Sequence, residues 1–471
     1  MRIAAVLLAL MTTGLVPEAQ NPPAVVLRKH FAPGGARYQY VPFEVPADAA
    51  SITITYSYTG ADGTSVIDLG LFEPGPLAMG TPAFRGYSGG NQRTVTVGLR
   101  TSSPGYRTGP LPAGTWQVML GMYKVAPAGV DVEITIAVTR AVSPASTLPE
   151  AGTHTSPPAG RDQPDLPKWY SGALHLHTIH SDGTLTPAAL ADAARGAGYD
   201  FIAITDHNNT THAREPIPSS PLHIIGEEVT TPGGHATVWG LPEGAWIDFR
   251  VAPRDPGAAD AVIGLVDAAH RAGALFAISH PIDNCDGCSW THIIPEGVDA
   301  IEIWQNEKAP RDAEIAVWDR LLREGRHVTA VGVSDWHRQP EPIDAAAVRV
   351  RAIGLTQSAI LEGIRRGQVI VMRNVLTLPP SVRARCRSAE ADVGESLTCA
   401  ANDELEVHVS MPEYADGNAE FSWNAARMTT KAIGRGTTFS MPAAPGYLRV
   451  RVYAADGSTV AITNPIHVSM R

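Results

Sequence analysis

From Trp169 onward, short apolar segments alternate with segments of helical periodicity, and almost every apolar segment ends in a polar cluster. The apolar segments, predicted to be buried strands, are residues 173–177, 201–205, 222–229, 236–241, 275–279, 298–304, 328–334 and 369–372. The predicted helices cover residues 187–197, 258–272, 313–324 and 357–366. Thr186 and Pro187 form a favourable N-cap and N1 pair for the first helix. This alternation predicts an α/β fold with parallel strands and helical crossovers.

The polar clusters contain nine residues of the types that bind metal ions. These are His175, His177, Asp182, His207, Glu228, His235, His280, Asp335 and His337. A lone histidine is usually structural or exposed, but the carboxyl ends of strands in β/α barrels meet at one mouth, so clustered ligands can converge there. Imidazole nitrogen and carboxylate oxygen suit Zn, Mn and Fe. We therefore predict a centre with two or three divalent ions.

The clusters resemble those of the polymerase-and-histidinol-phosphatase (PHP) superfamily of metallohydrolases. The motifs are the HxH of His175 and His177, an SDG, a TDH, a GxE, His235, an SHP and an SDxH, and they lie in the family's order within residues 169–375. The resemblance implies a distorted seven-stranded β/α barrel. Flanking β-rich regions and Asn464-Pro465-Ile466 near the end look closest to the CehA/McbA-type branch.

The resemblance also implies roles for the ligands. A first metal would be bound by His175, His177, Glu228 and Asp335. Glu228 would bridge to a second metal bound by His235 and His280, and a third would be bound by Asp182, His207 and His337. Residues two apart on a strand point the same way, which suits His175 with His177 and Asp335 with His337. Adjacent residues point to opposite faces, so only one of Glu227 and Glu228 can face the metals, and the motif favours Glu228. Asp206 should face away or support a ligand from behind.

Four other residues are candidates for substrate binding: His180, Asn306, Lys308 and Arg338. His180 and His212 flank ligand clusters, and for both of them a surface loop position is an alternative. Asn306 and Lys308 follow a predicted strand, and Arg338 follows the last cluster.

The predicted chemistry is hydrolysis. Adjacent cations about 3.5–4 Å apart can lower the pKa of a bridging water and clamp the attacking and leaving oxygens. The resulting hydroxide would be the nucleophile, with Glu228 bridging the metals and Asp335 orienting the nucleophile or passing a proton. Phosphoester hydrolysis is the majority activity that the superfamily implies, whereas the CehA/McbA-type branch suggests a carbamate, ester or amide. A non-catalytic metal-containing binding protein is a third hypothesis.

The remaining segments differ in texture. We predict a signal peptide at 1–20, a β-sandwich accessory domain at 25–140, a linker at 141–168, the metallohydrolase barrel at 169–380 and a C-terminal β-domain at 381–471. The first segment has a positive charge, a short apolar run and small residues near a plausible cleavage point; a retained anchor is the alternative. The prediction is export to a periplasmic or secreted location, without a transmembrane segment.

Composition indicates which classes of partner are expected and whether the cysteines can form disulfides. Lys and Arg total 37 against 47 Asp and Glu, a net charge of −10, which does not favour a dedicated nucleic-acid surface. A small-molecule substrate is the expected partner. The four cysteines can form two disulfides in an oxidising compartment. Of the three possible pairings, the sequence favours Cys386 with Cys399 and Cys285 with Cys288.

Overall fold

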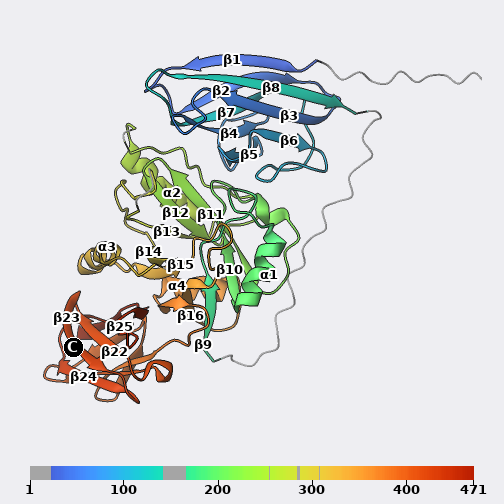
Figure 1. The fold of residues 1–471 in the computed structure, drawn as a ribbon. Coiled ribbons are helices and arrows are strands. Elements are labelled where there is room, and N and C mark those ends of the chain that lie inside the picture. The colour runs from blue at the N-terminus through green and yellow to red at the C-terminus, as the bar shows by residue number, and fades with distance from the viewer. Residues whose placement is uncertain (1–22, 142–165, 254, 284–286, 307) are drawn as a thin grey trace, which may run out of the picture.

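The structure is a computed structural model that describes residues 23–141, 166–253, 255–283, 287–306 and 308–471. The predicted signal peptide and most of the predicted linker lie outside the described residues. Strands predominate along the chain, and they form several sheets. Figure 1 shows a β-sandwich above a central sheet, with a further group of strands below it.

The N-terminal sandwich consists of two four-stranded antiparallel sheets. One has the order β1 (Val25–Phe31), β8 (Val130–Arg140), β3 (Ala49–Tyr58) and β6 (Thr94–Gly98). The other has the order β2 (Tyr38–Val45), β7 (Gly114–Lys124), β4 (Val66–Phe72) and β5 (Phe84–Gly89). Alternate side chains such as Ile52, Ile54 and Trp116 are fully buried between the sheets. The period-two pattern therefore produces the two-layer packing expected of it.

The central sheet carries the strands and helices of the second region. Its order is β15 (Thr329–Val333), β14 (Ala300–Gln305), β13 (Leu275–Ile278), β12 (Gly234–Trp239), β11 (Leu222–Thr231), β10 (Phe201–Ile204), β9 (Lys168–Ala173), β16 (Ala345–Ala352) and β17 (Val369–Asn374). The helices are α1 (Pro187–Ala197), α2 (Ala258–Arg271), α3 (Asp312–Arg323) and α4 (Gln357–Arg365), with a 3-10 helix η1 (Thr211–Arg214). Thr186 caps α1, because its side chain accepts a hydrogen bond from the Ala189 amide.

The described sheet does not show the predicted seven-stranded β/α barrel. The pairs β9–β10, β10–β11, β13–β14 and β14–β15 are parallel, but β11–β12, β12–β13, β9–β16 and β16–β17 are antiparallel. A two-residue turn at Pro232 and Gly233 joins β11 directly to β12. Buried strands give the same apolar pattern whether a hairpin or a helix connects them. The prediction of parallel strands with helical crossovers throughout was therefore wrong for the strands that are joined by hairpins.

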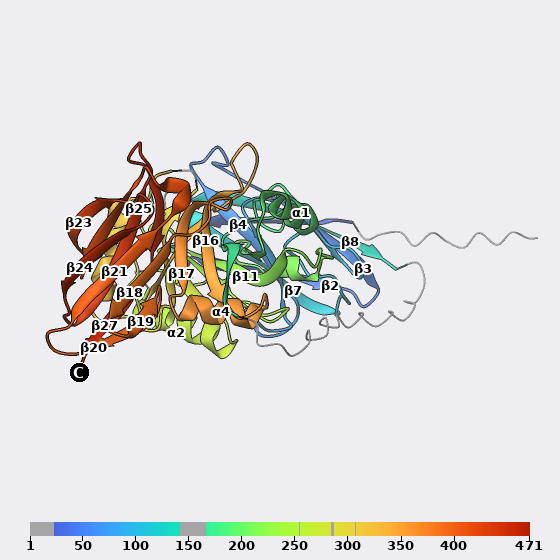
Figure 2. The same ribbon diagram turned by 90° about the horizontal axis from the view of Figure 1, so that it is seen from below.

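The C-terminal strands continue the central sheet. β17 pairs with β26 (Thr459–Thr463), and the sheet goes on through β25 (Gly446–Tyr453), β22 (Asn418–Trp423) and β23 (Ala426–Ala432). β27 (Ile466–Met470) pairs with β25 and with β20 (Ser396–Cys399). A small sheet of β19 (Ala389–Asp392), β18 (Ser381–Cys386), β21 (Glu404–Ser410) and β24 (Thr437–Pro442) packs against them, with a 3-10 helix η2 (Pro412–Tyr414) before β22. Figure 2 shows β16 and β17 beside these strands.

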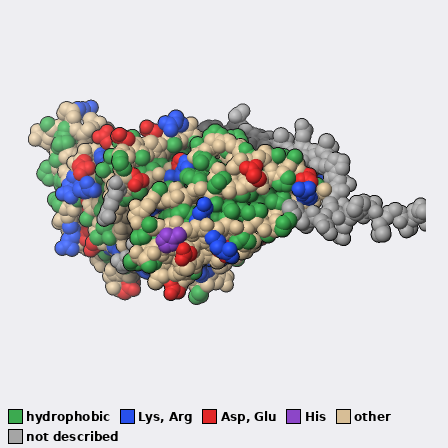
Figure 3. Space-filling model, turned by 90° about the horizontal axis from the view of Figure 1, so that it is seen from above, with side chains coloured by type: hydrophobic (Ala, Val, Ile, Leu, Met, Phe, Trp, Pro, Cys, Tyr) green, Lys and Arg blue, Asp and Glu red, His purple; other side chains and the backbone are tan. Residues whose placement is uncertain are grey.

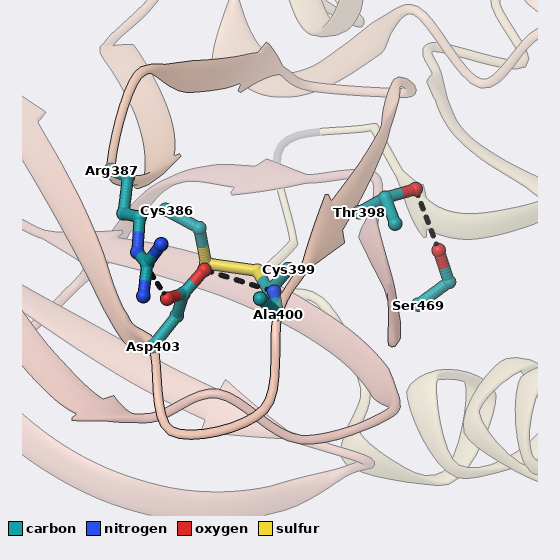
Figure 4. The surroundings of a disulfide bond; sticks show 7 residues. All are labelled: Cys386, Arg387, Thr398, Cys399, Ala400, Asp403 and Ser469. Carbon is teal, nitrogen blue, oxygen red and sulfur yellow. Dashed lines mark hydrogen bonds and ion pairs between the residues drawn. A yellow bond between two sulfur atoms is a disulfide. The ribbon is translucent and has the colours of Figure 1, made fainter. Parts of the chain in front are cut away.

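The disulfide between Cys386 and Cys399 is present, as the sequence predicts. It ties the end of β18 to the end of β20, and Asp403 lies beside it with its carboxylate bound to the Ala400 amide and to Arg387 (Figure 4). Cys288 is also disulfide-bonded, whereas Cys285, its expected partner, lies outside the described residues.

Charged side chains are dispersed on the face shown in Figure 3, where positive and negative groups are interspersed with hydrophobic and uncharged ones. None of the helices in the described part of the chain is long and apolar enough to cross a membrane.

Asn464 joins the C-terminal strands to β15, the strand that Ser334 and Asp335 follow. Its side chain is fully buried, accepts from the Ala330 amide at 2.8 Å, and donates to the carbonyls of Ala330 and Val369 at 2.8 and 3.0 Å. These bonds connect β15 to the edge of β17 where no strand-to-strand pairing is present among the described residues.

We predict that Asn464→Ala lowers the free energy of unfolding by about 2–4 kcal/mol, because it leaves buried backbone groups of β15 without partners. Urea denaturation of the full chain measures this. The control is Thr430→Ala, an exposed site on β23, for which the change should stay within about 0.5 kcal/mol. Equal effects of the two variants would contradict a structural role for the Asn464 amide.

Candidate metal centre

The predicted ligands lie close together at one end of the central sheet. His175 and His177 follow β9, His207 follows β10, and Glu228 and His235 lie on β11 and β12. His280, Asp335 and His337 follow β13 and β15. Between the first two histidines, Leu176 pairs with Trp336 and turns the opposite way, into the core. Strand alternation thus directs both imidazoles to the same side.

Glu228 lies at the centre of the group and is almost fully buried. Its Oε2 atom lies 3.3 Å from His175 Nε2, 3.5 Å from His177 Nε2 and 2.7 Å from His207 Nδ1. Its Oε1 atom lies 3.0 Å from His235 Nδ1 and 3.1 Å from His280 Nε2. One carboxylate therefore faces five imidazoles, with its two oxygens toward different sets of them.

Asp335 and Asp182 complete the group on either side of His177. Asp335 Oδ1 lies 3.3 Å from His175 Nε2 and 3.2 Å from His177 Nε2. Asp182 Oδ1 lies 3.7 Å from His207 Nε2, 3.7 Å from His177 Nδ1 and 3.4 Å from His337 Nε2. The structure thus brings all nine predicted ligands together.

Several buried polar atoms of this group have no hydrogen-bond partner, which is the condition expected of atoms that face a cation. They are His175 Nε2, Asp182 Oδ1, Glu228 Oε2, His235 Nε2 and His280 Nδ1. Buried polar atoms are normally satisfied, so such a concentration needs an explanation. Three sets of potential ligand atoms lie within 4.8 Å of one another: His177, Asp182, His207 and His337; His175, His177 and Asp335; and His207, Glu228 and His235. The residues fit divalent metals.

These sets differ in detail from the grouping that the family resemblance implies. His177 belongs to two of them, and His207 is grouped with Glu228 and His235 as well as with Asp182. Because the side chains are this closely spaced, one imidazole lies within reach of more than one ion position.

The surroundings favour the protonation state that metal binding needs at two carboxylates and at His177. Burial would raise the pKa of Glu228, but the imidazoles around it, His207 first, hold that pKa well below its usual range. Burial likewise opposes ionisation of Asp335, yet His175 and His177 lower its pKa well below normal. Burial, together with neighbouring imidazoles, lowers the pKa of His177 to about 4. The carboxylates are therefore anionic and His177 is neutral, as ligands must be.

At four other histidines burial lowers the pKa, but the nearby carboxylates outweigh it and raise the pKa above its usual range. They are His175, His207, His280 and His337. A bound cation would therefore have to displace their protons.

Two acidic residues hold the ligands from behind. Glu302, on β14, lies 2.8 Å from His175 Nδ1 through Oε1 and accepts from the His280 amide at 2.8 Å through Oε2. Asp206 accepts from the Thr178 amide and hydroxyl and from the Ser181 hydroxyl, all at 2.7 Å. Such contacts orient ligating imidazoles and fix their tautomers.

Glu302 was missed in the sequence, although an acid within an otherwise apolar segment was a signal available there; the structure shows that its side chain is fully buried. Asp206 was expected either to face away or to support a ligand. The structure places it behind the loop that carries Asp182.

The backbone is strained where two ligands leave their strands. His280 has φ of 26° and Asp335 has φ of 47°, in the left-handed region that residues other than glycine seldom adopt. Such strain persists only where surrounding contacts maintain it, and it is concentrated at functional sites. Here the Glu302 carboxylate accepts a hydrogen bond from the His280 amide, and this bond supports a backbone conformation that the chain alone would avoid.

Glu227 and Glu228 point in opposite directions from β11. Glu227 is buried away from the histidines, and its Oε2 accepts from the Ile247 amide at 2.8 Å. Burial raises the pKa of Glu227 to about 8. Strand alternation thus directs Glu228 toward the imidazoles and Glu227 into the opposite face, where it binds a backbone amide.

The four residues singled out for substrate contact lie elsewhere. His180 is buried between Thr211 and the Gly105 amide of the sandwich, at 2.7 and 3.3 Å, rather than on a surface loop, and His212 is also buried. Asn306 donates its amide to Val333 at the end of β15. Lys308 and Arg338 are exposed. None of the four is among the described residues that line the cavity beside the ligands.

That cavity, of about 360 Å³, has one wall from the central sheet and one from the N-terminal sandwich. Figure 1 shows β4 and β5 above the ligand-bearing end of β10 and β11. The interface is apolar: Phe84 lies 4.6 Å from Trp246 and Tyr87 lies 4.8 Å from Phe249 between ring centroids, within one shared core. Residues 25–140, which we predicted to be an accessory domain, therefore form one wall of this cavity.

No protein-family model matches the sequence, and no curated protein matches it. Three solved structures are similar in part. A two-domain protein from Bacteroides vulgatus containing a "predicted PHP-like metal-dependent phosphoesterase" is 16% identical, with a TM-score of 0.35 over 65% of this chain and 100% of that one. A protein from Bifidobacterium adolescentis assigned as a metal-dependent phosphoesterase is 18% identical, with a TM-score of 0.26 over 38% and 92%. An amidohydrolase from Chromobacterium violaceum, with bound sulfate and no metal, is 16% identical, with a TM-score of 0.25 over 36% and 88%. We therefore rest the functional proposal on the site alone.

We predict that Glu228→Gln and Glu227→Gln behave in opposite ways. Glu228→Gln should lose most bound metal, because a neutral amide replaces the anion among five imidazoles. Glu227→Gln should keep its metal. Elemental analysis of both proteins after metal loading measures this. The reverse result would mean that Glu227, and not Glu228, is the metal ligand.

Glu227→Gln should also change the pH dependence of stability. Because the folded-state pKa of Glu227 is raised, its contribution to stability is present at low pH and is lost as the pH rises through about 8. The variant should gain stability over the parent as the pH rises from about 5 to about 8. Urea denaturation at pH 5 and pH 8 tests the sign.

For Glu302→Gln, metal affinity should fall by roughly 10- to 100-fold, because the amide is a weaker acceptor for the His175 ring and the His280 amide. Competition with a chelator of known affinity measures the change. Glu406→Gln, which alters an exposed ion pair with Arg385, is the matched control and should leave metal affinity unchanged. An unaltered affinity in Glu302→Gln would mean that the backbone alone positions the ligands.

Proposed function

We propose that this chain is a multinuclear metal-dependent hydrolase of the PHP superfamily, of the CehA/McbA-type branch. The observation that carries the proposal is the buried Glu228 carboxylate facing five imidazoles, with unpartnered buried atoms in the same group. A structural role alone would leave these polar atoms without compensation, at a cost that folded proteins avoid.

Two or three divalent ions would be bound, drawn from Zn, Mn and Fe. His175, His177, Glu228 and Asp335 would hold the first; Glu228, His235 and His280 the second; and Asp182, His207 and His337 the third. When bound, such ions lower the pKa of water toward neutrality and polarise the phosphoryl or carbonyl oxygen of a substrate.

The protein's own groups orient the reaction. Asp335 remains partly exposed, with 23% of its side chain accessible, while Oδ1 faces the two histidines. In this proposal the carboxylate orients a nucleophilic water or passes a proton. Glu302 keeps the His175 ring fixed during this step, because it occupies that ring's Nδ1.

Phosphoester hydrolysis is the first candidate reaction, since a cluster of cations suits a phosphoryl group. Hydrolysis of a carbamate, ester or amide is the second. The specific observation in its favour is that neither Lys nor Arg is among the described residues lining the cavity, so an uncharged substrate is also accommodated. We further propose export to the periplasm or the medium, supported by the Cys386–Cys399 disulfide, because disulfides persist in oxidising compartments.

The full-length protein loaded with Mn, Zn or Fe should carry more than one ion per chain by elemental analysis. It should hydrolyse one of three probes: p-nitrophenyl phosphate, bis-p-nitrophenyl phosphate or an aryl N-methylcarbamate. Chelation should abolish turnover and metal should restore it, while Glu228→Gln, prepared in parallel, reports any contaminating hydrolase. One ion or fewer after loading would contradict the multinuclear site. Full metal without turnover of any probe would favour a non-catalytic binding protein.

A further inference from the structure

The cavity beside the metal ligands is lined by the central sheet and by the N-terminal sandwich. Its walls include Asp182, His207 and His235 on the central sheet side, and Asp68, Tyr87 and Asn91 on the sandwich. A substrate that occupies this cavity with its reacting group beside His207 and His235 would place its remaining part against the sandwich wall.

The sandwich wall is held in place by polar as well as apolar contacts. Asn91 Nδ2 donates to the Ser181 carbonyl at 2.5 Å, next to Asp182, and the Gly105 amide donates to His180 Nδ1 at 3.3 Å. These bonds connect the sandwich to the loop that carries a predicted ligand. Together with the shared aromatic core, they make the wall a defined surface and not a loosely docked neighbour.

Asp68 is the charged group on this wall. Tyr87, buried on β5, donates its hydroxyl to Asp68 Oδ2 at 2.7 Å. The described residues place no hydrogen bond on Oδ1. Burial raises the pKa of Asp68 to about 6, with the Tyr87 hydroxyl opposing the rise, so the group is an anion under mildly alkaline conditions.

The cationic groups whose charges act on Asp68 are His207, which lines the same cavity, and Arg37 and Arg93, which do not line it. His207 is a predicted metal ligand and would be neutral in the metal-loaded protein, so its ring would not balance Asp68 there. Arg37, whose charge acts on Asp68 from a neighbouring hollow, directs Nη1 to the carbonyls of Met122 and Tyr123 at 3.3 and 3.5 Å. A half-buried carboxylate with a free oxygen is best compensated by a cationic donor, and a tyrosine ring beside it adds a favourable surface for one.

We propose that Asp68, supported by Tyr87, binds a protonated amine on the part of the substrate remote from the reacting bond. This rests on the proposed function, since the metal side of the cavity would hold the reacting group. The substrate class is then an ester of an amino alcohol or a similarly cationic compound. Polyanions are disfavoured, because a second phosphate would face Asp68.

Calorimetric binding to the metal-loaded full chain at pH 8 tests this without any need for turnover. The probes are 2-aminoethyl and 3-aminopropyl phosphate, compared with ethyl, propyl and 2-hydroxyethyl phosphate. At least one amine should bind about tenfold more tightly than its alkyl counterpart, as expected for one charge-assisted hydrogen bond. In Asp68→Asn this ratio should fall to about twofold or less, while ethyl phosphate binding and metal content stay unchanged.

Two further variants sharpen the result. Tyr87→Phe should reduce the amine preference by a smaller factor, because it removes only the support for Asp68. Asp131→Asn, an exposed aspartate on the outer sheet, is the matched control and should keep the full preference.

Four results would each overturn the proposal. Amine and alkyl phosphates could bind with equal affinity, or 2-hydroxyethyl phosphate could bind as tightly as the amine. The amine preference could survive in Asp68→Asn, or no phosphate could bind at all. Amine-dependent binding without turnover of any probe would overturn the hydrolase and leave the amine subsite standing. Turnover of a probe without an amine preference would support the hydrolase and overturn the amine subsite.

Discussion

The burial of Glu228 among five histidines is the constraint on which the rest of the site depends. An isolated carboxylate in such a place would be costly, and so would a group of buried imidazoles without acceptors. Each makes the other tolerable, and several buried atoms of the group still have no hydrogen-bond partner. The backbone supports this arrangement, since the Glu228 amide and carbonyl bond to Asp206 and Asn208 in the segment that follows β10.

The supporting contacts show how the fold holds a polar cluster in an apolar setting. Glu302 and Asp206 sit behind the ligands on strands or strand ends, where they are buried and hydrogen-bonded. Positive φ angles at His280 and Asp335 turn two ligands inward at the strand ends. At His280 the strain and a buried acid are linked directly, because Glu302 accepts a hydrogen bond from the amide of that strained residue.

The sandwich and the C-terminal strands constrain the same site from two directions. The sandwich shares its core with the central sheet and forms one wall of the cavity. The C-terminal strands extend the sheet through β17 and β26, and Asn464 reaches back to β15, whose end carries Asp335. Three regions that differ in sequence composition thus contact or support one cluster of potential metal ligands.

By itself, the sequence determined which residue types stand at the strand ends, and it favoured the pairing of Cys386 with Cys399. Local rules required that only one of the two adjacent glutamates face the imidazoles, because side chains alternate along a strand, and that the ends of neighbouring strands lie together. The choice of Glu228 over Glu227 came from the resemblance to a known family. Only the tertiary structure decided that β11 and β12 form a hairpin, that Glu302 holds His175 across 127 residues of sequence, and that Asp68 faces the ligands from another sheet. The reason is physical: apolar periodicity records which side of a strand is buried, but not which distant strand buries it.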